Sequence, residues 1–185
     1  MAGKPLEKNL LNKTLVIVAD ALNLHLGNKW FIGYGTLLGI HRDNSCIKDD
    51  DDVDILIDIK DREKTIKILK DAGFKLKPAF VYGIRSILKD MFGYKKRIIQ
   101  TISTDTLASV DIYLCDIDSQ GNYLDEWNRV IWNNCFINGK LIEKKWNGTV
   151  LLLPYNYESK LTARYGNWKI PSSNKCDGDS IGNLP

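Results

Sequence analysis

The first part of the chain has a hydrophobic pattern that changes from helical spacing to strand-like spacing. Between residues 11 and 26, an apolar side chain recurs every three or four positions, at Leu11, Leu15, Val18, Leu22 and Leu26. This spacing places them on one face of an α-helix, which Gly27 is suited to end. The aromatic and β-branched run at 29–34 predicts a buried strand. Gly35 and Thr36 end that strand, and residues 37–42 predict a short helix.

Several further segments read as strands. Residues 53–58 and 109–116 are apolar and β-branched, which is typical of buried strands. Residues 74–103 alternate in polarity and predict two more strands. Asn-Gly pairs at 138–139 and 147–148 each lie between β-prone runs, and this dipeptide favours the tight turn of a hairpin.

Two more helices are predicted after residue 60. Asp61 can cap the first and Gly73 can end it. Its apolar face is expected to carry Ile66, Leu69 and Ala72. The second ends at Gly166 and has helically spaced apolar residues at Tyr157, Leu161 and Tyr165.

The order of these elements defines the fold class. Helices and strands are mixed along the chain, which predicts an α+β (mixed α/β) protein with a sheet of about five strands. No repeat or linker divides the sequence, so we expect a single domain over residues 1–171. Residues 172–185 are rich in Ser, Asn, Gly and Asp and predict an irregular tail.

Composition adds little beyond a globular class. The 185-residue chain has a net charge of +3, which is too mild for a basic nucleic-acid-binding stripe, so no nucleic-acid partner is expected. No apolar run reaches the roughly 18 residues of a membrane span, and the polar N-terminus lacks a signal-peptide core. We therefore expect a soluble cytoplasmic protein. Its cysteines form no C-x-x-C pair and predict reduced structural thiols: Cys46, Cys115, Cys135 and Cys176.

The most informative segment is the acidic run at residues 49–54. Taken alone, a run of acidic residues is a solvated loop about as often as it is part of a functional site. Here a strand follows, and because side chains alternate along a strand, Asp52 and Asp54 point to one face while Val53 and Ile55 point to the core. Two carboxylates at the end of a buried strand repel each other unless a cation lies between them. Oxygen ligands of this kind suit Mg²⁺ or Mn²⁺ with bound phosphate.

A calcium-binding EF-hand is the obvious alternative for an Asp-rich segment. That loop needs glycine at its sixth position and glutamate at its twelfth. Counted from Asp50, these positions hold Ile55 and Asp61, so this sequence does not fit.

Two other features suggest a phosphate-handling site. Glycine allows close approach of a ligand to the backbone, and a helix N-terminus offers free N–H groups, so Gly35 and Thr36 are candidate substrate-binding residues. Asp111 lies within an apolar strand, where an unpaired carboxylate is costly. In a structural role, Asp111 would pair with a basic residue. In a functional role, it would be a third metal ligand or the base that accepts the proton of the acceptor hydroxyl.

An ordered set of Gly-Thr, Asp-x-Asp and a later strand Asp is typical of the nucleotidyltransferase fold, and the finer pattern resembles the LicD/fukutin family. The family shows G-[ST]-L-L-G-x-x-R, which residues 35–42 resemble, then an acidic D-D-D-[IV]-D-[IL] segment, which residues 50–55 match. Residues 110–116 resemble its V-D-I-F-P-L-D segment, and residues 154–171 its closing P-x-x-Y…L…Y-G-x-W…P segment. Lys48 and Asp49 replace the family's Pro-Trp.

The resemblance implies a metal-dependent transferase. Such an enzyme moves a phospho-substituent, such as phosphocholine or a polyol phosphate, from a CDP-activated donor to a sugar hydroxyl of a glycan acceptor. Asp52, Asp54 and Asp111 are then the catalytic residues and the ligands of Mg²⁺ or Mn²⁺. Arg42, on the helix after Gly35, is expected to hold a phosphate oxygen, with a surface salt bridge to the acidic run as the alternative.

Two alternatives remain at this point. One is a nucleotidyltransferase that moves NMP from an NTP to a small molecule, a protein or an RNA end. The other is a binding module that keeps the fold without catalysis, against which the intact acids argue.

Overall fold

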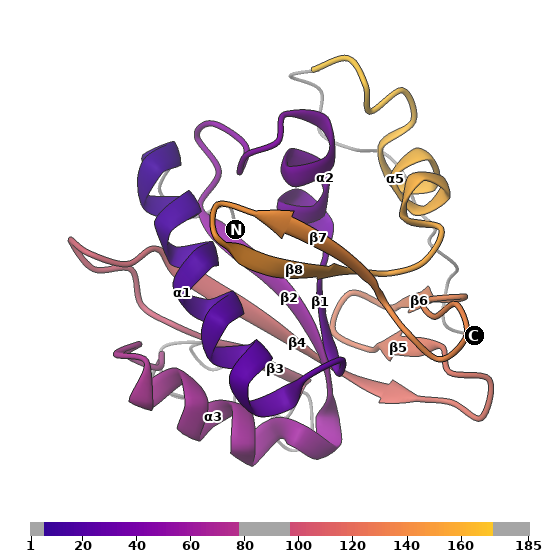
Figure 1. The fold of residues 1–185 in the computed structure, drawn as a ribbon, viewed down its shortest axis with the longest axis horizontal. Helices are drawn as coiled ribbons and strands as arrows, with labels where there is room; N and C mark the ends of the chain where they lie inside the picture. The colour runs from indigo at the N-terminus through magenta and orange to yellow at the C-terminus, as the bar shows by residue number, and fades with distance from the viewer. Residues whose placement is uncertain (1–5, 78–96, 172–185) are drawn as a thin grey trace, which may run out of the picture.

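The computed structural model describes residues 6–77 and 97–171, and Figure 1 shows their arrangement. The centre is a six-stranded sheet in which β1, β2, β4, β5 and β6 follow one another and β3 pairs with β4. Strands β2 and β4 are parallel, whereas the other pairs are antiparallel. The strands are β1 (Trp30–Ile32), β2 (Asp52–Asp58), β3 (Ile98–Gln100), β4 (Ser109–Ile117), β5 (Tyr123–Asp125) and β6 (Val130–Trp132). The predicted mixed α+β class is confirmed, with six strands where about five were expected.

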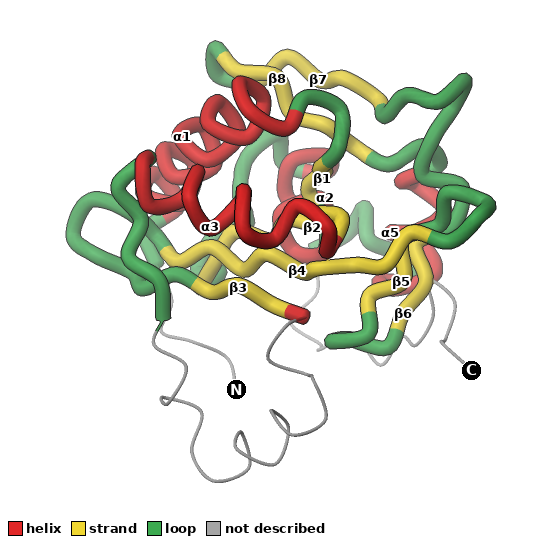
Figure 2. The backbone as a smooth tube through the Cα atoms, turned by 90° about the horizontal axis from the view of Figure 1, so that it is seen from below, coloured by secondary structure: helices red, strands yellow, loops and turns green. Residues whose placement is uncertain are grey.

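Helices and a separate hairpin pack around this sheet. Helix α1 (Lys8–Leu26) lies beside α3 (Arg62–Asp71), and both views show the two together (Figures 1 and 2). Helix α2 (Tyr34–Arg42) packs on β2, and α5 (Tyr157–Tyr165) lies near α2. The two-stranded hairpin of β7 (Ile142–Trp146) and β8 (Thr149–Leu153) contacts α1 and β1.

The strand alternation that the sequence predicts is present in β2 and β4. Val53 and Ile55 have no exposed surface, and their partners Val110 and Ile112 on β4 are equally buried. The five apolar residues of the N-terminal helix are also buried, and α1 contacts β2. This core therefore occupies one side of β2 and β4, and the side chains at the alternate positions project from the other side.

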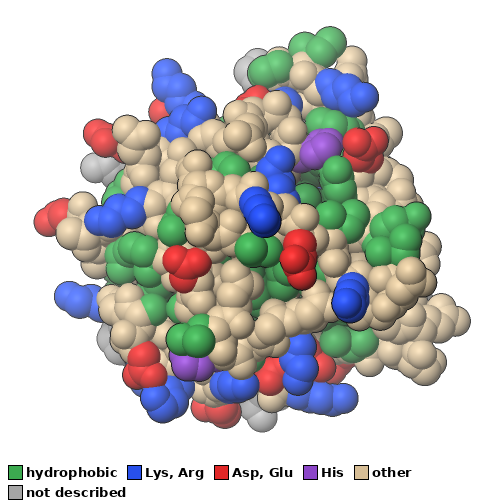
Figure 3. Space-filling view, viewed as in Figure 1, with side chains coloured by type: hydrophobic (Ala, Val, Ile, Leu, Met, Phe, Trp, Pro, Cys, Tyr) green, Lys and Arg blue, Asp and Glu red, His purple; other side chains and the backbone are tan. Residues whose placement is uncertain are grey.

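The surface has no single dominant charge on the face seen in Figure 3. Lysine and arginine side chains are interspersed with acidic ones there, as the small net charge leads one to expect. None of the helices in the described ranges combines the length and the apolar character needed to cross a bilayer. Of the four cysteines predicted to be reduced thiols, Cys46, Cys115 and Cys135 are buried and free, and Cys176 lies outside the described residues.

The first strand is shorter than predicted, and the following helix starts earlier. Strand β1 ends at Ile32, and Gly33 precedes α2, whose first residue is Tyr34. The prediction that Tyr34 belongs to the strand, and that Gly35 and Thr36 precede the helix, was therefore wrong. The aromatic character of Tyr34 indicated burial, which a helix at this position also provides, since Tyr34 is 5% exposed.

The helix after β2 has the predicted limits but a shifted buried face. Its buried residues are Thr65, Ile68 and Leu69, whereas Ile66 and Ala72 are only partly buried. Thr65 can be buried because its hydroxyl donates to the Asp61 carbonyl at 2.9 Å, which satisfies it within the helix.

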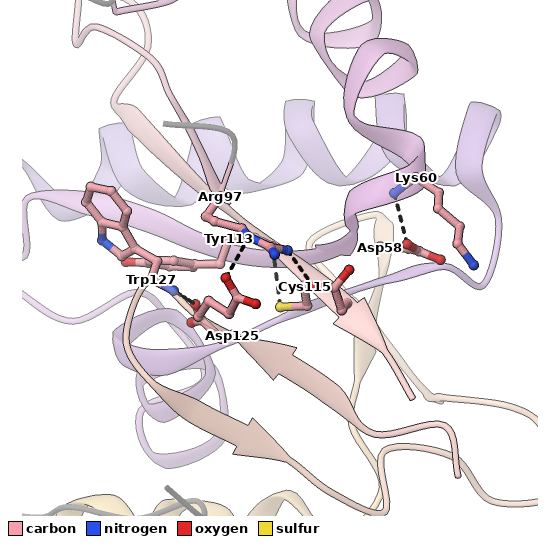
Figure 4. Close-up of polar contacts among 9 residues, drawn as sticks. Asp58, Lys60, Arg97, Tyr113, Cys115, Asp125 and Trp127 are labelled. Atoms are coloured by element: carbon pink, nitrogen blue, oxygen red, sulfur yellow. Dashed lines mark hydrogen bonds and ion pairs between the residues drawn. The ribbon is translucent and has the colours of Figure 1, made fainter. Parts of the chain in front are cut away.

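The capping at that helix also differs from the sequence expectation. Asp61 stands at the N-cap position, yet its side chain makes no capping hydrogen bond. Asp58 instead accepts a hydrogen bond from the Lys60 N–H at 2.9 Å, at the start of the short 3₁₀ helix Ile59–Asp61 (Figure 4).

The two Asn-Gly pairs behave differently. Asn147 and Gly148 both have positive φ and join β7 to β8, so this hairpin is confirmed. Asn138 and Gly139 also form a tight turn with positive φ, but only a single bridge between Ile137 and Lys140 flanks it. Strands β5 and β6 were not anticipated. Of the two strands expected within 74–103, β3 is present, and the part at 78–96 lies outside the described residues.

Candidate active site

Three predicted acids lie on the same side of the two parallel strands. Asp54 on β2 is the register partner of Asp111 on β4, so their side chains project in the same direction. Asp52, two positions before Asp54, projects to this side as well. Asp54 and Asp111 are 6% and 7% exposed, and Asp52 is half-buried. The structure thus brings together Asp52, Asp54 and Asp111 from segments about fifty residues apart.

Asp54 is held in place by hydrogen bonds on both carboxylate oxygens. Its Oδ2 accepts the backbone N–H of Gly35 at 3.0 Å, and its Oδ1 accepts the hydroxyl of Tyr113 at 3.1 Å. Its own backbone N–H donates to the Thr36 hydroxyl at 2.8 Å. Gly35 and Thr36, predicted to contact substrate, therefore first serve to fix this acid; their direct contact with substrate stays a prediction. Tyr113 was missed from the sequence.

Asp111 has an amide partner on the neighbouring strand. The side chain of Gln100 on β3 donates from Nε2 to Asp111 Oδ2 at 2.6 Å. Within the described residues no salt bridge involves Asp111, and Lys77 acts on it only through its field. The alternative role of Asp111, a structural ion pair with a basic residue, is therefore not seen among the described residues.

Asp50 is an addition to the predicted site. One carboxylate oxygen from each of Asp50, Asp51 and Asp52 lies within 4.8 Å of the other two. Asp50 also faces the start of α2, because a Cβ placed on Gly35 would lie 2.8 Å from Asp50 Oδ2 and 3.4 Å from Asp54 Oδ2. The absence of a side chain at Gly35 thus lets two carboxylates approach one point of the backbone. Asp50 opens the D-D-D-[IV]-D-[IL] segment that residues 50–55 match, but it was not assigned to the site from the sequence.

The loop that carries these acids is anchored on α1 and β4. The side chain of Asn12 accepts the backbone N–H of Cys46 at 2.9 Å and donates to the Ser45 hydroxyl at the same distance. The Ser109 hydroxyl donates to the Asp51 carbonyl at 2.6 Å. Gly39 allows the loop to pass close to α2, because a Cβ there would lie 2.6 Å from the Ser45 carbonyl oxygen.

Burial and mutual repulsion shift the acids toward their protonated forms. Burial, followed by the charges of neighbouring carboxylates, raises the pKa of both Asp52 and Asp54 strongly above the usual range. Burial also raises the pKa of Asp111 to about 6, although Gln100 and Lys77 oppose the shift. A site of this kind is electrostatically unfavourable when all its acids are ionised and no cation is present.

These residues fit a hard divalent cation. The available ligand atoms are carboxylate oxygens, which Mg²⁺ and Mn²⁺ prefer, and the described residues near them offer no sulfur or imidazole ligand to the cluster. The raised pKa values have the direction that a nearby positive charge would reverse. The Asp52 carboxylate makes no hydrogen bond within the described part of the chain, so it can take a ligand position without losing a partner.

Arg42 pairs with an acid outside the acidic run. Its guanidinium makes paired hydrogen bonds of 2.8 and 2.7 Å with the carboxylate of the neighbouring Asp43. The alternative of a salt bridge to residues 49–54 is not seen among the described contacts. The adjacent His41 faces α5, where its Nε2 lies 3.4 Å from Glu158 and its ring packs on Tyr157.

A model of a known protein family matches most of the chain. The chain matches the family model described as LicD/FKTN/FKRP, nucleotidyltransferase domain, over residues 27–156. This range includes every acid of the site and both parallel strands. A sequence search among curated proteins gives no match.

Solved structures resemble the chain in fold. A solution structure of the antibiotic-resistance factor ANT(2'')-Ia has a TM-score of 0.53 at 12% identity, covering 89% of this chain and 78% of that one. A crystal structure of ANT(2'')-Ia with adenylyl-2''-tobramycin has a TM-score of 0.49 at 13% identity, covering 80% and 74%. The lincomycin-bound lincosamide adenylyltransferase LnuA has a TM-score of 0.48 at 16% identity, covering 87% and 89%.

Proposed function

Because the chain belongs to the LicD/FKTN/FKRP nucleotidyltransferase domain family, we propose that it transfers a phospho-substituent from a CDP-activated donor to a sugar hydroxyl of a glycan. Phosphocholine and polyol phosphates are the substituents that the motif resemblance favours. The observation that carries the proposal is the alignment of Asp54 and Asp111 across two parallel strands, with Asp52 on the same side. Asp50, Asp52, Asp54 and Asp111 form no salt bridge with any residue that the structure describes, which suits a site for a cation and a diphosphate.

Asp52, Asp54 and Asp111 would hold Mg²⁺ or Mn²⁺. When bound, the cation neutralises the charge of the donor's diphosphate and of the leaving group. Asp54 is held by Gly35 and Tyr113, so it would keep its orientation as donor arrives. Asp50 is a candidate further ligand because its carboxylate lies beside that of Asp52.

The reaction requires a proton acceptor. The acceptor's hydroxyl oxygen attacks the phosphorus that bears the substituent, and the bond to the bridging oxygen breaks so that CMP leaves. The hydroxyl proton must pass to a base, and Asp111 can take this role instead of the third ligand position. Its pKa of about 6 leaves it mostly ionised near neutral pH, which a general base needs.

Arg42 is proposed to bind a phosphate oxygen. To do so its guanidinium must exchange Asp43 for the phosphate, which offers the same paired acceptor geometry with more negative charge. Lysine keeps the positive charge but lacks the paired N–H donors of the guanidinium. Arg42→Lys is therefore expected to raise the KM for the donor more than it lowers kcat.

The test is a donor screen with Mg²⁺ or Mn²⁺ present. The protein is incubated with CDP-choline, CDP-ribitol or CTP and a mixture of glycan acceptors, and the products are identified by mass spectrometry. Release of CMP supports the proposal, whereas release of pyrophosphate from CTP indicates transfer of NMP instead. The matched control is Asp49→Asn, which removes an exposed acid from the same run. Asp54→Asn should abolish turnover and Asp49→Asn should not; equal turnover in both would contradict the proposal.

A further inference from the structure

Tyr34 has an unusual backbone conformation next to the acids. Its φ is +44°, in the left-handed region that side chains other than glycine rarely adopt, and such strain persists only where the surroundings hold it. The ring is 5% exposed. It lies between the rings of Tyr113 and Trp132, with centroids at 4.8 and 5.1 Å, and the Arg164 guanidinium covers it at 4.6 Å.

The Tyr34 hydroxyl is hydrogen-bonded to a buried carboxylate, that of Asp125. It donates a short hydrogen bond to Asp125 Oδ2 and accepts one from Trp132 Nε1 at 3.3 Å. Asp125 has no exposed surface. Its carboxylate also accepts the backbone N–H of Trp127 at 3.0 Å (Figure 4). It accepts the backbone N–H of Asn128 at 3.2 Å as well. Tyr34 is therefore bound to the same carboxylate that holds the turn after β5.

That turn is tied back to the central sheet. Arg97 Nη1 lies 2.6 Å from Asp116 Oδ2 at the end of β4, and its Nε lies 2.9 Å from Glu126 Oε2, directly after β5 (Figure 4). The Asp125 carboxylate thus has a fixed position relative to β4, the strand that carries Asp111 and Tyr113.

Two paths lead from Tyr34 to Asp54. Along the backbone, the next residue is Gly35, whose N–H donates to Asp54 Oδ2. Through the side chains, the Tyr34 ring packs edge-on against the ring of Tyr113, whose hydroxyl donates to Asp54 Oδ1. Both donors that fix the Asp54 carboxylate are therefore placed by Tyr34.

We propose that Tyr34 and Asp125 are positioning residues that hold the Asp54 carboxylate in its cation-binding orientation beside the other acids. Without them, repulsion from the neighbouring carboxylates would favour a rotation of Asp54 away from the cluster. The inference rests on the proposed function in one respect, namely that Asp54 binds a divalent cation. Hydrogen-bonded groups behind a metal ligand commonly change metal affinity by about 10–100-fold when removed.

The experiment measures Mn²⁺ binding by the whole chain without substrate. Titrations followed by electron paramagnetic resonance give the dissociation constant for the wild type, Tyr34→Phe and Asp125→Asn. Tyr123→Phe is the matched control, because it removes the hydroxyl of another buried tyrosine that packs on Phe31 rather than on the site. We expect about tenfold weaker binding for Tyr34→Phe and Asp125→Asn. Tyr123→Phe should bind as the wild type does.

A background variant separates positioning from general loosening of the fold. In Asp54→Asn, any remaining Mn²⁺ affinity should not fall further when Tyr34→Phe is added, because the carboxylate that Tyr34 positions is already absent. If Tyr34→Phe weakens binding by the same factor in both backgrounds, the positioning role is refuted. Should Asp125→Asn fail to fold, Tyr34→Phe decides alone, since it keeps the buried ring and removes only the hydroxyl.

The outcomes also separate this inference from the proposed function. If the wild type and Asp54→Asn bind Mn²⁺ equally, or neither binds it, the cation site itself is wrong and the inference fails with it. If Asp54→Asn loses binding while folded Tyr34→Phe and Asp125→Asn keep the wild-type affinity, only the positioning role is overturned.

Discussion

Replacing Asp111 by asparagine is expected to make the metal-free protein more stable and the enzyme inactive. Asparagine has nearly the same shape, and its oxygen can still accept the hydrogen bond from Gln100. What it removes is a negative charge that is 7% exposed and lies near other carboxylates. If Asp111 served to stabilise the fold, its replacement would lower the free energy of unfolding instead of raising it.

The magnitude follows from the pKa of Asp111. Folding raises this pKa from 3.8 to about 6, so the folded protein binds a proton that the unfolded chain has already lost. Stability contributed by this group therefore falls as pH rises from about 4 to about 6, and the loss is complete above that range. Because one pKa unit corresponds to 1.36 kcal/mol, the full loss is about 3 kcal/mol. Asp111→Asn should recover this amount at about pH 7.5 and about half of it at about pH 5.

The assay is urea unfolding and thermal unfolding of the wild type and Asp111→Asn at these two pH values, in EDTA and in Mg²⁺. In EDTA at the higher pH, the variant's melting temperature should exceed that of the wild type by about 6–12 °C, since 1 kcal/mol shifts a protein of this size by about 2–4 °C. Mg²⁺ at about a hundred times its dissociation constant should stabilise the wild type by about 2.7 kcal/mol. The variant, with one ligand fewer, should gain less.

Three results would each refute a part of this reasoning about Asp111. A variant that is less stable than the wild type in EDTA at the higher pH would make Asp111 a structural acid with a favourable partner. Equal stabilisation of both proteins by Mg²⁺ would place the cation elsewhere. Retained turnover in Asp111→Asn would remove its catalytic role whatever its stability.

Other substitutions test separate parts of the site. Asp52→Asn should abolish Mg²⁺-dependent donor binding. Unchanged binding measured by calorimetry would contradict the proposed role of Asp52 as a metal ligand. Gly35→Ala places a Cβ 2.8 Å from a carboxylate oxygen of Asp50 and should weaken Mn²⁺ binding about tenfold; wild-type affinity in a titration would count against the close approach. Gly148→Ala, at φ +84° in the β7–β8 turn, should cost about 1 kcal/mol in urea unfolding while kcat stays unchanged, and a loss of activity would link that hairpin to the site.

Local patterns in the sequence were sufficient for the central elements. The strands around Asp54 and Asp111 and the face shared by Asp52 follow from the two-residue period of a strand. The end of α1 follows from Gly27, whose φ is +56°. Strands β5 and β6 have three residues each, too few for any period to be recognised.

Other members of the site depend on pairing between distant segments. Tyr113 holds Asp54 only because β2 and β4 pair in parallel with a particular register, which no local pattern specifies. Asp50 was one acid among several until the path of the loop beside Gly35 was known. The start of α2 at Tyr34 was missed because a short apolar run indicates burial but does not separate a strand from a helix.

The parallel register of β2 and β4 has a consequence for how the protein folds. Asp54 and Asp111 meet only after the chain between them has closed a long loop, and such non-local pairing is slow to form. A slip of one residue in this pairing would turn one set of acids to the opposite side of the sheet. The complete cluster therefore arises late, and a divalent ion should slow unfolding while leaving the rate of refolding nearly unchanged.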